Sequence, residues 1–539
     1  MRMSSTPKSR FFHRGCMARV LTGTIHPHLN LASITAFSRT LEAAFSEEHH
    51  LLNGMVYTRG SSEDYDRIAN ITGDSGWSWE RLQPYIRKNE RWTPPVDNHS
   101  TVGQFDPSVH SLTGINSVTL SGFSLPIDQR VIQTTRELPG EFTFTLDMNS
   151  GHQLGVGWAQ LTIGNGSRSS SATSYLGSKY RHRVNLHILL NSQVTRVLHT
   201  RNTTSVNGTL DVRTVELVDV SAGINPGSQR VTVSAKKEVI LSAGTFGTPN
   251  VLLHSGIGDQ SSLAALGITP VLHLPSVGRN LSDHVAGLTS WSVNTTTETL
   301  DSIQRNSTQL TVALAEWNNS HTGLLSSTGG NIIGFHRLPD NATIFRETPD
   351  PAPGPNTAHY ELLFVPGSLF PAPEGNFFSV AASLLTATSR GSVTINSSNP
   401  LAAPVINPNS LAEPFDLFTL RESIRAIFRF VQSPTWNGVI TGPASSLAGV
   451  NISDDAQLDS YLRTTSQLGY HVVGTSAMTA RGAAYGVTDP DLKVKGVSGL
   501  RIVDASVIPF LPSAHTQVPT YIIAERAADL IKQAWKRQA

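Results

Sequence analysis

The chain has 539 residues, of which 39% are hydrophobic and 15% are charged, and its formal net charge is +1. A chain of this length and composition can bury a large core, as one two-lobed enzyme or as two closely associated domains. The near-zero charge and the lack of aromatic residues interleaved with basic runs argue against a nucleic-acid-binding surface. No apolar run approaches the ~20 residues that span a bilayer.

The single cysteine, Cys16, excludes an intrachain disulfide framework and a cysteine-based zinc site. Asn-x-Ser/Thr sequons are frequent, as expected of a secreted glycoprotein. They begin at Asn70, Asn98, Asn165, Asn202, Asn207, Asn280, Asn294, Asn306, Asn318, Asn341, Asn396 and Asn451. Residues 1–30 contain basic residues but no apolar core of a signal peptide. The frequent sequons and the lack of a signal-peptide core agree if a longer form of the protein carries the signal peptide. We therefore expect the full-length protein to be secreted and extracellular.

The first 45 residues have no clear periodicity and are expected to be irregular. Further along, apolar spacing and turn residues predict regular elements. In chain order these are a helix over 79–90, strands over 187–198 and 215–242, strands over 379–385 and 391–396, a helix over 416–432, a strand over 500–509 and a helix over 521–531. The mixture of strands and helices indicates an α/β or α+β protein.

Two histidines, 44 residues apart, stand out near the C-terminus. His471 follows Gly469-Tyr470, and His515 follows Ser513-Ala514. The strand pattern before His515 and the helix pattern after it place that imidazole at the carboxyl edge of a sheet, where ligands bind in open α/β folds. Two imidazoles that face one substrate can share proton removal and hydrogen bonding near neutral pH.

The chain resembles the glucose–methanol–choline (GMC) oxidoreductases, a family of FAD-dependent alcohol oxidases and dehydrogenases. Four ordered blocks carry the resemblance: Asn53–Ser61, Gly166–Leu176, Glu238–Gly258 and the two histidine segments. Together they extend from about residue 50 to the C-terminus. The fungal aryl-alcohol oxidase and pyranose dehydrogenase branch is the most similar one.

The resemblance implies an α/β (α+β) fold with a Rossmann-like FAD-binding lobe, incomplete at its N-terminus, and an antiparallel-sheet substrate-binding lobe. The implied segments are 1–45 (irregular), 46–285 (FAD-binding lobe, incomplete), 286–479 (substrate-binding lobe) and 480–539 (return to the FAD-binding lobe). No Gly-x-Gly-x-x-Gly loop after a strand, which would hold the FAD pyrophosphate, is present in the sequence. We therefore expect a truncated chain, from an incomplete gene model or a splice variant.

By the same resemblance, His515 is expected to be the catalytic base and His471 its hydrogen-bonding partner, with a reversed or shared division left open. A structural role, the more common one for a histidine, is the alternative. The residues expected to contact FAD are Asn53, Gly54, Met55, Val56, Val194, Asp504, Ala505, Thr516 and Gln517. A capping role for Asp504 and a plain strand role for Val194 remain alternatives. Leu52 stands before Asn53, so a covalent histidine–flavin bond is not expected.

Neither a His-Glu-x-x-His motif nor a Gly-x-Ser-x-Gly elbow in a strand–helix context occurs, so metal and serine-hydrolase chemistry are not expected. The first functional hypothesis is FAD-dependent oxidation of a primary aryl alcohol to the aldehyde, with oxygen or a quinone as electron acceptor. Oxidation of a sugar is the alternative donor chemistry. The second hypothesis, from another class, is a truncated remnant that folds but does not retain FAD. Trp92, Phe364 and Tyr470 could line an apolar funnel that leads to the substrate, although core packing is the more common role of such residues.

Overall fold

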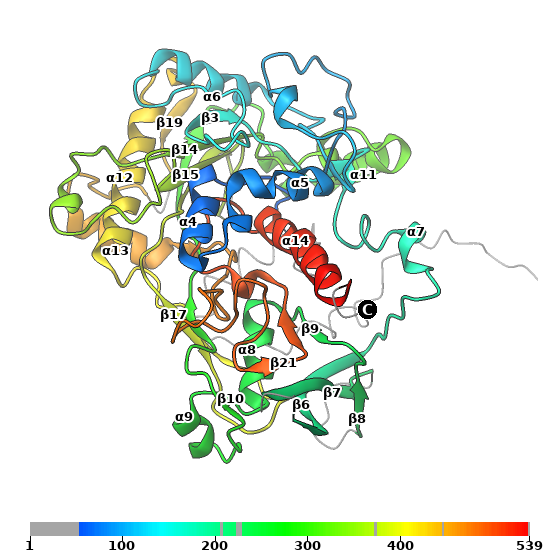
Figure 1. Cartoon of the computed structure of the whole chain (residues 1–539). Helices are drawn as coiled ribbons and strands as arrows, with labels where there is room; N and C mark the ends of the chain where they lie inside the picture. The colour runs from blue at the N-terminus through cyan, green and yellow to red at the C-terminus, as the bar shows by residue number, and fades with distance from the viewer. Residues whose placement is uncertain (1–52, 205–208, 222–228, 371–373, 445–446, 537–539) are drawn as a thin grey trace, which may run out of the picture.

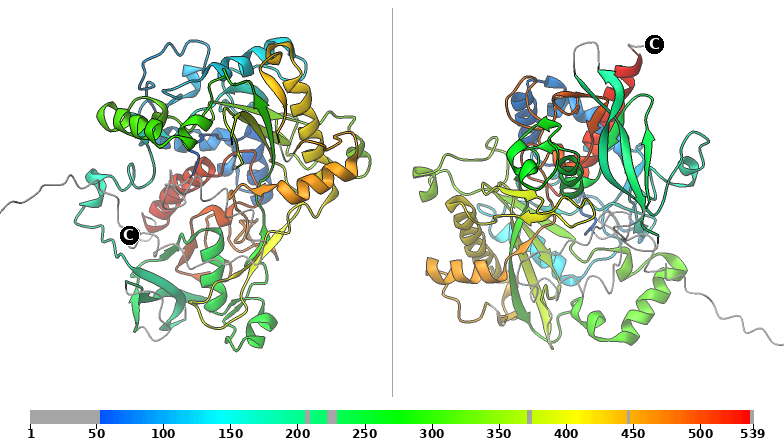
Figure 2. Two further views of the ribbon diagram at one scale, coloured as in Figure 1. Left: turned by 180° about the vertical axis from the view of Figure 1, so that it is seen from behind. Right: turned by 90° about the horizontal axis from the view of Figure 1, so that it is seen from below.

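The computed structural model describes residues 53–204, 209–221, 229–370, 374–444 and 447–536. The segment 1–45, expected to be irregular, lies outside these residues. Figure 1 shows an upper part built on one large sheet and a lower part built on smaller sheets, with the C-terminal helix α14 (Gln517–Lys536) between them. Figure 2 shows the same arrangement from behind and from below.

The large sheet is antiparallel throughout, with strand order β19-β13-β16-β15-β14-β3 and with β20 paired to β13. Its strands are β3 (Gly155–Trp158), β13 (Val285–Val293), β14 (Ile332–His336), β15 (Tyr360–Val365), β16 (Asn376–Leu384), β19 (Ile440–Pro443) and β20 (Gln467–Leu468). This arrangement confirms the antiparallel sheet expected of the substrate-binding lobe. Its edge strand β3 comes from earlier in the chain than the expected segment 286–479.

Helix α12 (Pro414–Val431) covers this sheet along β13, β15 and β16. It begins at Pro414, whose fixed φ suits the first turn of a helix and whose missing N–H costs nothing there. Phe430 of α12 packs against Phe364 of β15, with ring centroids 4.8 Å apart. Phe364 is therefore a core residue, which is the more common of the two roles considered for it.

The lower part is built on β6, β7 and β8, which pair antiparallel, with β21 added parallel to β7. Beside it, β9 and β22 form a parallel pair. The strands are β6 (Ser192–Thr204), β7 (Leu210–Asp219), β8 (Arg230–Ser234), β9 (Val239–Leu241), β21 (Val497–Ser498) and β22 (Leu500–Ile502). Strand β9 leads directly into α8 (Gly244–His254), which packs against β6.

Helix α14 packs against α5 (Trp79–Asn89), so the C-terminal helix and the N-terminal described helices lie side by side in Figure 1. Helix α4 (Ser62–Thr72) begins with a capping box in which Ser61 and Asp64 bond each other's backbone N–H groups. The remaining helices are α6 (Pro126–Glu137), α7 (Ser178–Arg181), α9 (Gln260–Ala265), α10 (Asp301–Arg305), α11 (Ser307–Ser320) and α13 (Asp455–Thr465). The remaining strands are β1 (Glu90–Trp92), β2 (Asn116–Val118), β4 (Ile163–Gly164), β5 (Ser167–Arg168), β10 (Ile257–Gly258), β11 (Leu272–His273), β12 (Arg279–Leu281), β17 (Gly391–Thr394) and β18 (Val405–Asn407).

Among the described residues, no helix combines the length and the apolar character that crossing a membrane requires. The predicted strand over 187–198 begins later than its pattern suggested, as β6 from Ser192. The reason is Asn191, whose φ of +53° is incompatible with an extended strand. The apolar side chains before it remain exposed, Ile188 and Leu189 among them.

Candidate active site

The two histidines from the C-terminal motifs lie face to face. His471 is in the loop after β20, and His515 is in the loop that precedes α14. Their ring centroids are 4.6 Å apart, with an angle of 57° between the ring planes. The fold thus brings together two imidazoles that are 44 positions apart in the chain, close enough for one small oxygen-bearing group to contact both.

The His515 loop is held at two backbone positions. The His515 N–H donates to Thr58 Oγ1 at 2.9 Å, and the Ser513 N–H donates to Asp64 Oδ2 at 3.0 Å. Asp64 is the third residue of α4 and shares its capping box with the N-cap Ser61, so the start of that helix fixes the loop. The position of the His515 ring therefore depends on the segment from Thr58 to Asp64, far away in sequence.

The His515 ring faces a carboxylate that the sequence analysis missed. Glu361, in β15, is 2% exposed, and both of its carboxylate oxygens lie 3.1 Å from Nε2 of His515. With Glu361 ionised, Nε2–H donates to the carboxylate and the lone pair of a neutral His515 ring lies on Nδ1. A buried carboxylate at this distance stabilises a positive charge on the imidazole.

A third histidine, also missed, contacts His471. Nδ1 of His284 lies 2.8 Å from Nδ1 of His471, and Nε2 of His284 lies 3.2 Å from the carbonyl oxygen of Pro512. Burial lowers the pKa of His284 to about 3, assisted by the charge of His515 and opposed by nearby carbonyls. Burial also lowers the pKa of His471 well below its ordinary value, with further contributions from the charges of His515 and His284. Both rings are neutral at pH 7.

The expected flavin-edge turn has a strained and open geometry. Asn53 Oδ1 accepts the Met55 N–H at 2.9 Å, and Met55 adopts φ of +59°, which a non-glycine residue rarely does. Arg168 Nη1 donates to the carbonyl oxygen of Asn53 at 2.7 Å, and burial lowers the pKa of this guanidinium to about 10. No atom of the described residues lies within 4 Å of a Cβ placed at Gly54, so on their side a flat group could approach the turn.

The turn meets the start of α14. The Thr162 N–H donates to the Met55 carbonyl at 2.7 Å, and Thr162 Oγ1 lies 3.5 Å from Oε1 of Gln517. The amide nitrogen of Gln517 is buried and has no hydrogen-bond partner among the described residues. Such an unpaired donor is costly unless a further acceptor is bound there. Val56 pairs with Leu161 in the same region. The structure thus places Asn53, Met55, Val56 and Gln517 together.

Asp504 and Ala505 follow strand β22 and come before the His515 loop in the chain. Oδ2 of Asp504 accepts the Gly244 N–H at 3.0 Å and the Thr248 hydroxyl at 2.6 Å, and Oδ1 accepts the Ser506 N–H at 2.9 Å. The carboxylate is therefore used for capping, and burial raises its pKa. A cofactor contact by this residue would have to come from its backbone. Ala505 follows in a short 3₁₀ turn.

Two other expected cofactor residues are less informative. Thr516 is 9% exposed, and its carbonyl oxygen accepts the Thr520 N–H at 3.1 Å, in the first turn of α14. Val194 lies in β6 opposite Leu217, in a different sheet from Glu361. The expected role of Val194 at the adenine therefore stays a prediction.

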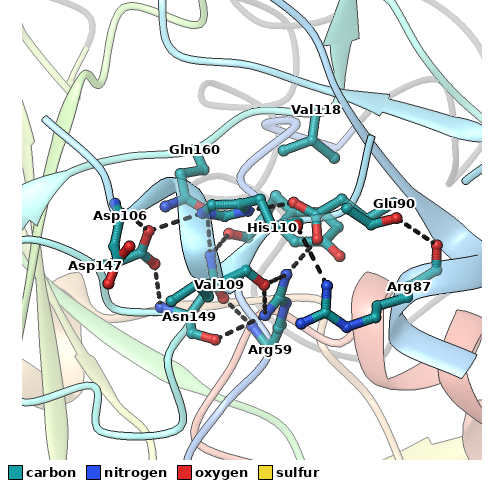
Figure 3. A network of polar contacts seen from close by, with 12 residues as sticks. Arg59, Arg87, Glu90, Asp106, Val109, His110, Val118, Asp147, Asn149 and Gln160 are labelled. Atoms are coloured by element: carbon teal, nitrogen blue, oxygen red, sulfur yellow. Dashed lines mark hydrogen bonds and ion pairs between the residues drawn. The ribbon is translucent and has the colours of Figure 1, made fainter. Parts of the chain in front are cut away.

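Figure 3 shows a second buried cluster of polar side chains, around Arg59, Glu90 and His110. Both ring nitrogens of His110 contact carboxylates, Nδ1 that of Glu90 and Nε2 that of Asp147 at 2.7 Å. Arg59 forms an ion pair with Glu90 and donates its Nη1 to the Asn149 carbonyl at 2.9 Å. Burial alone would lower the pKa of His110, but the bonds to Asp147 and Glu90 outweigh it and raise the pKa. The cluster holds Arg59 directly behind Thr58, which contacts His515.

In the described ranges, no group of three or more potential ligands could hold a metal ion. The flavin-ring end of an FAD site fits the residues present, because an unpaired buried amide, an open glycine and two facing imidazoles surround one region. The pyrophosphate end does not: from residue 53 onward, outside the gaps already given, no glycine-rich loop joins a strand to a helix N-terminus.

Comparisons with known proteins identify the class. Family models described as GMC oxidoreductase match residues 50–286 and 387–524. The chain belongs to the GMC oxidoreductase family, whose members depend on FAD. It is 44% identical over 490 residues to a dehydrogenase of Hericium erinaceus, covering 89% of this chain and 80% of that protein.

Two further comparisons bear on the branch of the family. A pyranose dehydrogenase of Agaricus campestris is 38% identical over 500 residues, covering 90% of this chain and 79% of that protein. A solved structure of a fungal aryl-alcohol oxidase superposes with a TM-score of 0.76 at 29% identity, covering 90% of this chain and 85% of that one. The family suggested by the sequence motifs is confirmed, and both expected branches are among the similar proteins.

Proposed function

We propose that this oxidoreductase oxidises the CH–OH group of a primary alcohol to the aldehyde. The observation that carries the proposal is the facing pair His471 and His515, with ring centroids 4.6 Å apart. Alcohol oxidation breaks the O–H bond and the adjacent C–H bond. A neutral imidazole takes the hydroxyl proton, and the second imidazole forms a hydrogen bond to the same oxygen. FAD, when bound, supplies the hydride acceptor.

The residues around the pair support this chemistry. Glu361, against His515, stabilises the positive charge that arises when the histidine pair takes up the proton. The sequence-based assignment made His515 the base and His471 its partner, and Glu361 supports a cationic His515 at some stage of the reaction. Loss of either imidazole should therefore impair the chemical step rather than the seating of the cofactor.

The donor is the finer question. The sequence ranked an aromatic primary alcohol first, and similarity to an aryl-alcohol oxidase supports it. One observation favours a sugar: the Glu361 carboxylate has His515 as its only hydrogen-bonding partner in the described chain, although an ionised carboxylate can accept about four bonds. Neighbouring hydroxyls of a sugar would satisfy the remaining positions, and similarity to a pyranose dehydrogenase agrees.

Turnover assays distinguish the two donors. The flavin-loaded protein is given benzyl alcohol or glucose, each with oxygen or with benzoquinone as the electron acceptor. Good turnover of glucose with none of benzyl alcohol would establish the sugar donor, and the opposite result would establish the aromatic one. Inactivity with both donors and both acceptors would overturn the proposed function.

The alternative, a protein that folds without retaining FAD, has one structural argument. The described residues offer no pyrophosphate loop, and each lost charge-assisted hydrogen bond costs on the order of 1.5–3 kcal/mol of cofactor binding. The purified protein would then be colourless and would take up added FAD only weakly. A flavin absorption spectrum near full occupancy in the purified protein would rule out this alternative.

A further inference from the structure

We infer that His284 is a positioning residue that fixes the tautomer of His471, so that Nε2 of His471 always offers a lone pair to the alcohol hydroxyl. The inference rests on the proposed function for its chemical meaning. The tautomer itself follows from hydrogen bonds among described residues and can be tested without any turnover.

The argument begins at the far side of His284. Its Nε2 lies 3.2 Å from the carbonyl oxygen of Pro512, and a carbonyl oxygen can only accept a hydrogen bond. Nε2 therefore carries a proton. His284 is 1% exposed and is held neutral by that burial, which moves its pKa to about 3. A neutral imidazole has one N–H, so Nδ1 of His284 has none and can only accept.

The proton position on His471 follows directly. Its Nδ1 lies 2.8 Å from Nδ1 of His284, and two nitrogens at that distance need one proton between them. Because His284 can only accept, the N–H belongs to Nδ1 of His471. His471 is itself neutral, so its Nε2 carries the lone pair. Within the described chain, this Nε2 has no hydrogen-bond partner, so the lone pair is available to a substrate.

The backbone around His284 holds His471 in the same place. The His471 N–H donates to Oδ1 of Asp283 at 2.7 Å, and the Gly469 N–H donates to the His284 carbonyl at 2.7 Å. Ser282 pairs with Val473 as an isolated antiparallel bridge. The three residues Ser282, Asp283 and His284 thus hold both the main chain and the ring of His471. A displaced His471 ring cannot easily re-form the Nδ1 contact elsewhere.

The consequence for the reaction is a division of work. The hydroxyl O–H would lie toward Nε2 of His471, so that the O–H bond breaks and an N–H bond forms on this nitrogen. FAD, when bound, would supply the acceptor for the hydride that leaves the adjacent carbon, and the alcohol becomes the aldehyde. His471 becomes an imidazolium with Nδ1–H still donated to His284. His515 donates Nε2–H to Glu361, so it can also donate a hydrogen bond to the oxygen only when Nδ1 carries a second proton. The tautomer thus favours the reversed division that the sequence analysis left open.

Two substitutions separate the functions of the His284 ring. In His284→Asn, the amide oxygen can take the place of Nδ1 and still accept from His471. In His284→Gln, the longer amide can replace Nε2 near Pro512, but the acceptor for His471 is lost. His359→Gln serves as the control for loss of a buried histidine: both of its ring nitrogens are bonded, to the Leu338 N–H at 3.0 Å and to Asp350 at 2.9 Å.

The direct test is ¹⁵N NMR of histidine-labelled protein, with the His471 signal assigned by its loss in His471→Asn. Wild type and His284→Asn should show His471 protonated at Nδ1, as should His359→Gln. His284→Gln should lose this signature. A wild-type His471 protonated at Nε2 would overturn the inference whatever the variants do, so poor folding of His284→Gln cannot leave it undecided.

Kinetics provide the second measurement. We expect kcat of His284→Gln to fall about 10- to 100-fold, as for other losses of an orienting partner, with KM little changed because the tautomer acts in the chemical step. His284→Asn should recover most of the rate. Equal losses in both variants would indicate a purely structural role. Absence of alcohol oxidation in every form would overturn the proposed function while leaving the NMR result valid.

Discussion

At the scale of single residues, Asp283 is a carboxylate whose ionisation opposes folding. Oδ1 accepts the His471 N–H, but Oδ2 is buried and has no hydrogen-bond partner in the part of the chain that the structure describes. Burial raises the pKa of Asp283 to about 7, although backbone N–H groups partly oppose the shift. A carboxyl whose pKa is higher in the folded protein stabilises it at low pH, and this contribution is lost as the pH rises through the folded-state pKa.

We therefore predict that Asp283→Asn removes part of the pH dependence of stability. The wild-type free energy of unfolding should fall, relative to the variant, between pH 4 and pH 7, by about 1.4 kcal/mol for each pKa unit of the shift. The amide keeps an acceptor for the His471 N–H, so the fold is retained. Urea unfolding at several pH values measures the difference, and parallel pH curves for the two proteins would contradict it.

A second residue-scale prediction concerns the histidine pair. His471→Ala and His515→Ala should each slow flavin reduction by about 10²–10⁴-fold, because each removes an imidazole from the alcohol oxygen. Neither side chain is expected to hold FAD, so flavin content should be unchanged. Stopped-flow absorbance of flavin-containing protein measures reduction directly. A rate near that of wild type in either variant would remove that residue from the proposed chemistry.

How far the site could be foreseen depends on sequence separation. His471 and His515 were visible because each lies in a distinctive local motif. Glu361 contacts His515 across 154 positions, and His284 contacts His471 across 187, so no local pattern could join them. A weak signal existed for His284, since Asp283 and His284 are two polar residues directly before the largely apolar β13. Only the folded structure shows that His284 contacts His471.

At the scale of elements, helices were more predictable than sheet composition. The pattern over 416–432 foretold α12, because helical periodicity is local. The joining of β3 to the large sheet could not be foreseen, because pairing of Gly155–Trp158 with β14 is set by tertiary contacts. Likewise, the backbone conformation of Asn191 delayed the start of the predicted strand over 187–198 to Ser192.

The cluster of Figure 3 gives a prediction at the scale of elements. In it, Arg59 donates a hydrogen bond to Glu90, the first residue of β1, and so connects two separate segments of the chain. His110→Leu leaves Glu90 and Asp147 without their shared cation, and breaking such a buried pair costs about 3–5 kcal/mol. The pKa of His110 is raised, so its contribution is complete below about pH 6.5 and declines above the raised pKa.

Urea unfolding near pH 6 and near pH 9 tests this prediction. The loss of stability in His110→Leu should be larger at pH 6. His99→Gln is the matched control, because His99 contacts Asp97 at the same 2.7 Å but is more exposed, and exposed pairs contribute about 0–1 kcal/mol. An equal effect of the two substitutions would mean that the buried cluster does not stabilise the fold.

At the scale of the whole molecule, the sequons can be sorted by exposure. Those whose asparagine is exposed on the described surface are Asn70, Asn98, Asn165, Asn306, Asn318, Asn341, Asn396 and Asn451. Asn280 differs: its amide nitrogen donates to the Pro509 carbonyl at 2.9 Å, and its amide oxygen accepts from Arg390 at 3.0 Å. A glycan on that nitrogen would replace a structural hydrogen bond beside the loop that carries His515.

We propose that the protein is secreted and glycosylated at exposed sequons, and we predict that Asn280 stays unmodified. Protein produced in the secretory pathway of a fungal host should lose mass when treated with a glycosidase that converts each glycosylated asparagine to aspartate. Peptide mapping then shows which positions were converted. Conversion confined to exposed asparagines is expected, because the transferase must reach the amide in an accessible segment. Conversion at Asn280 would show that the sequon is modified before the loop closes over it, and no conversion anywhere would argue against secretion.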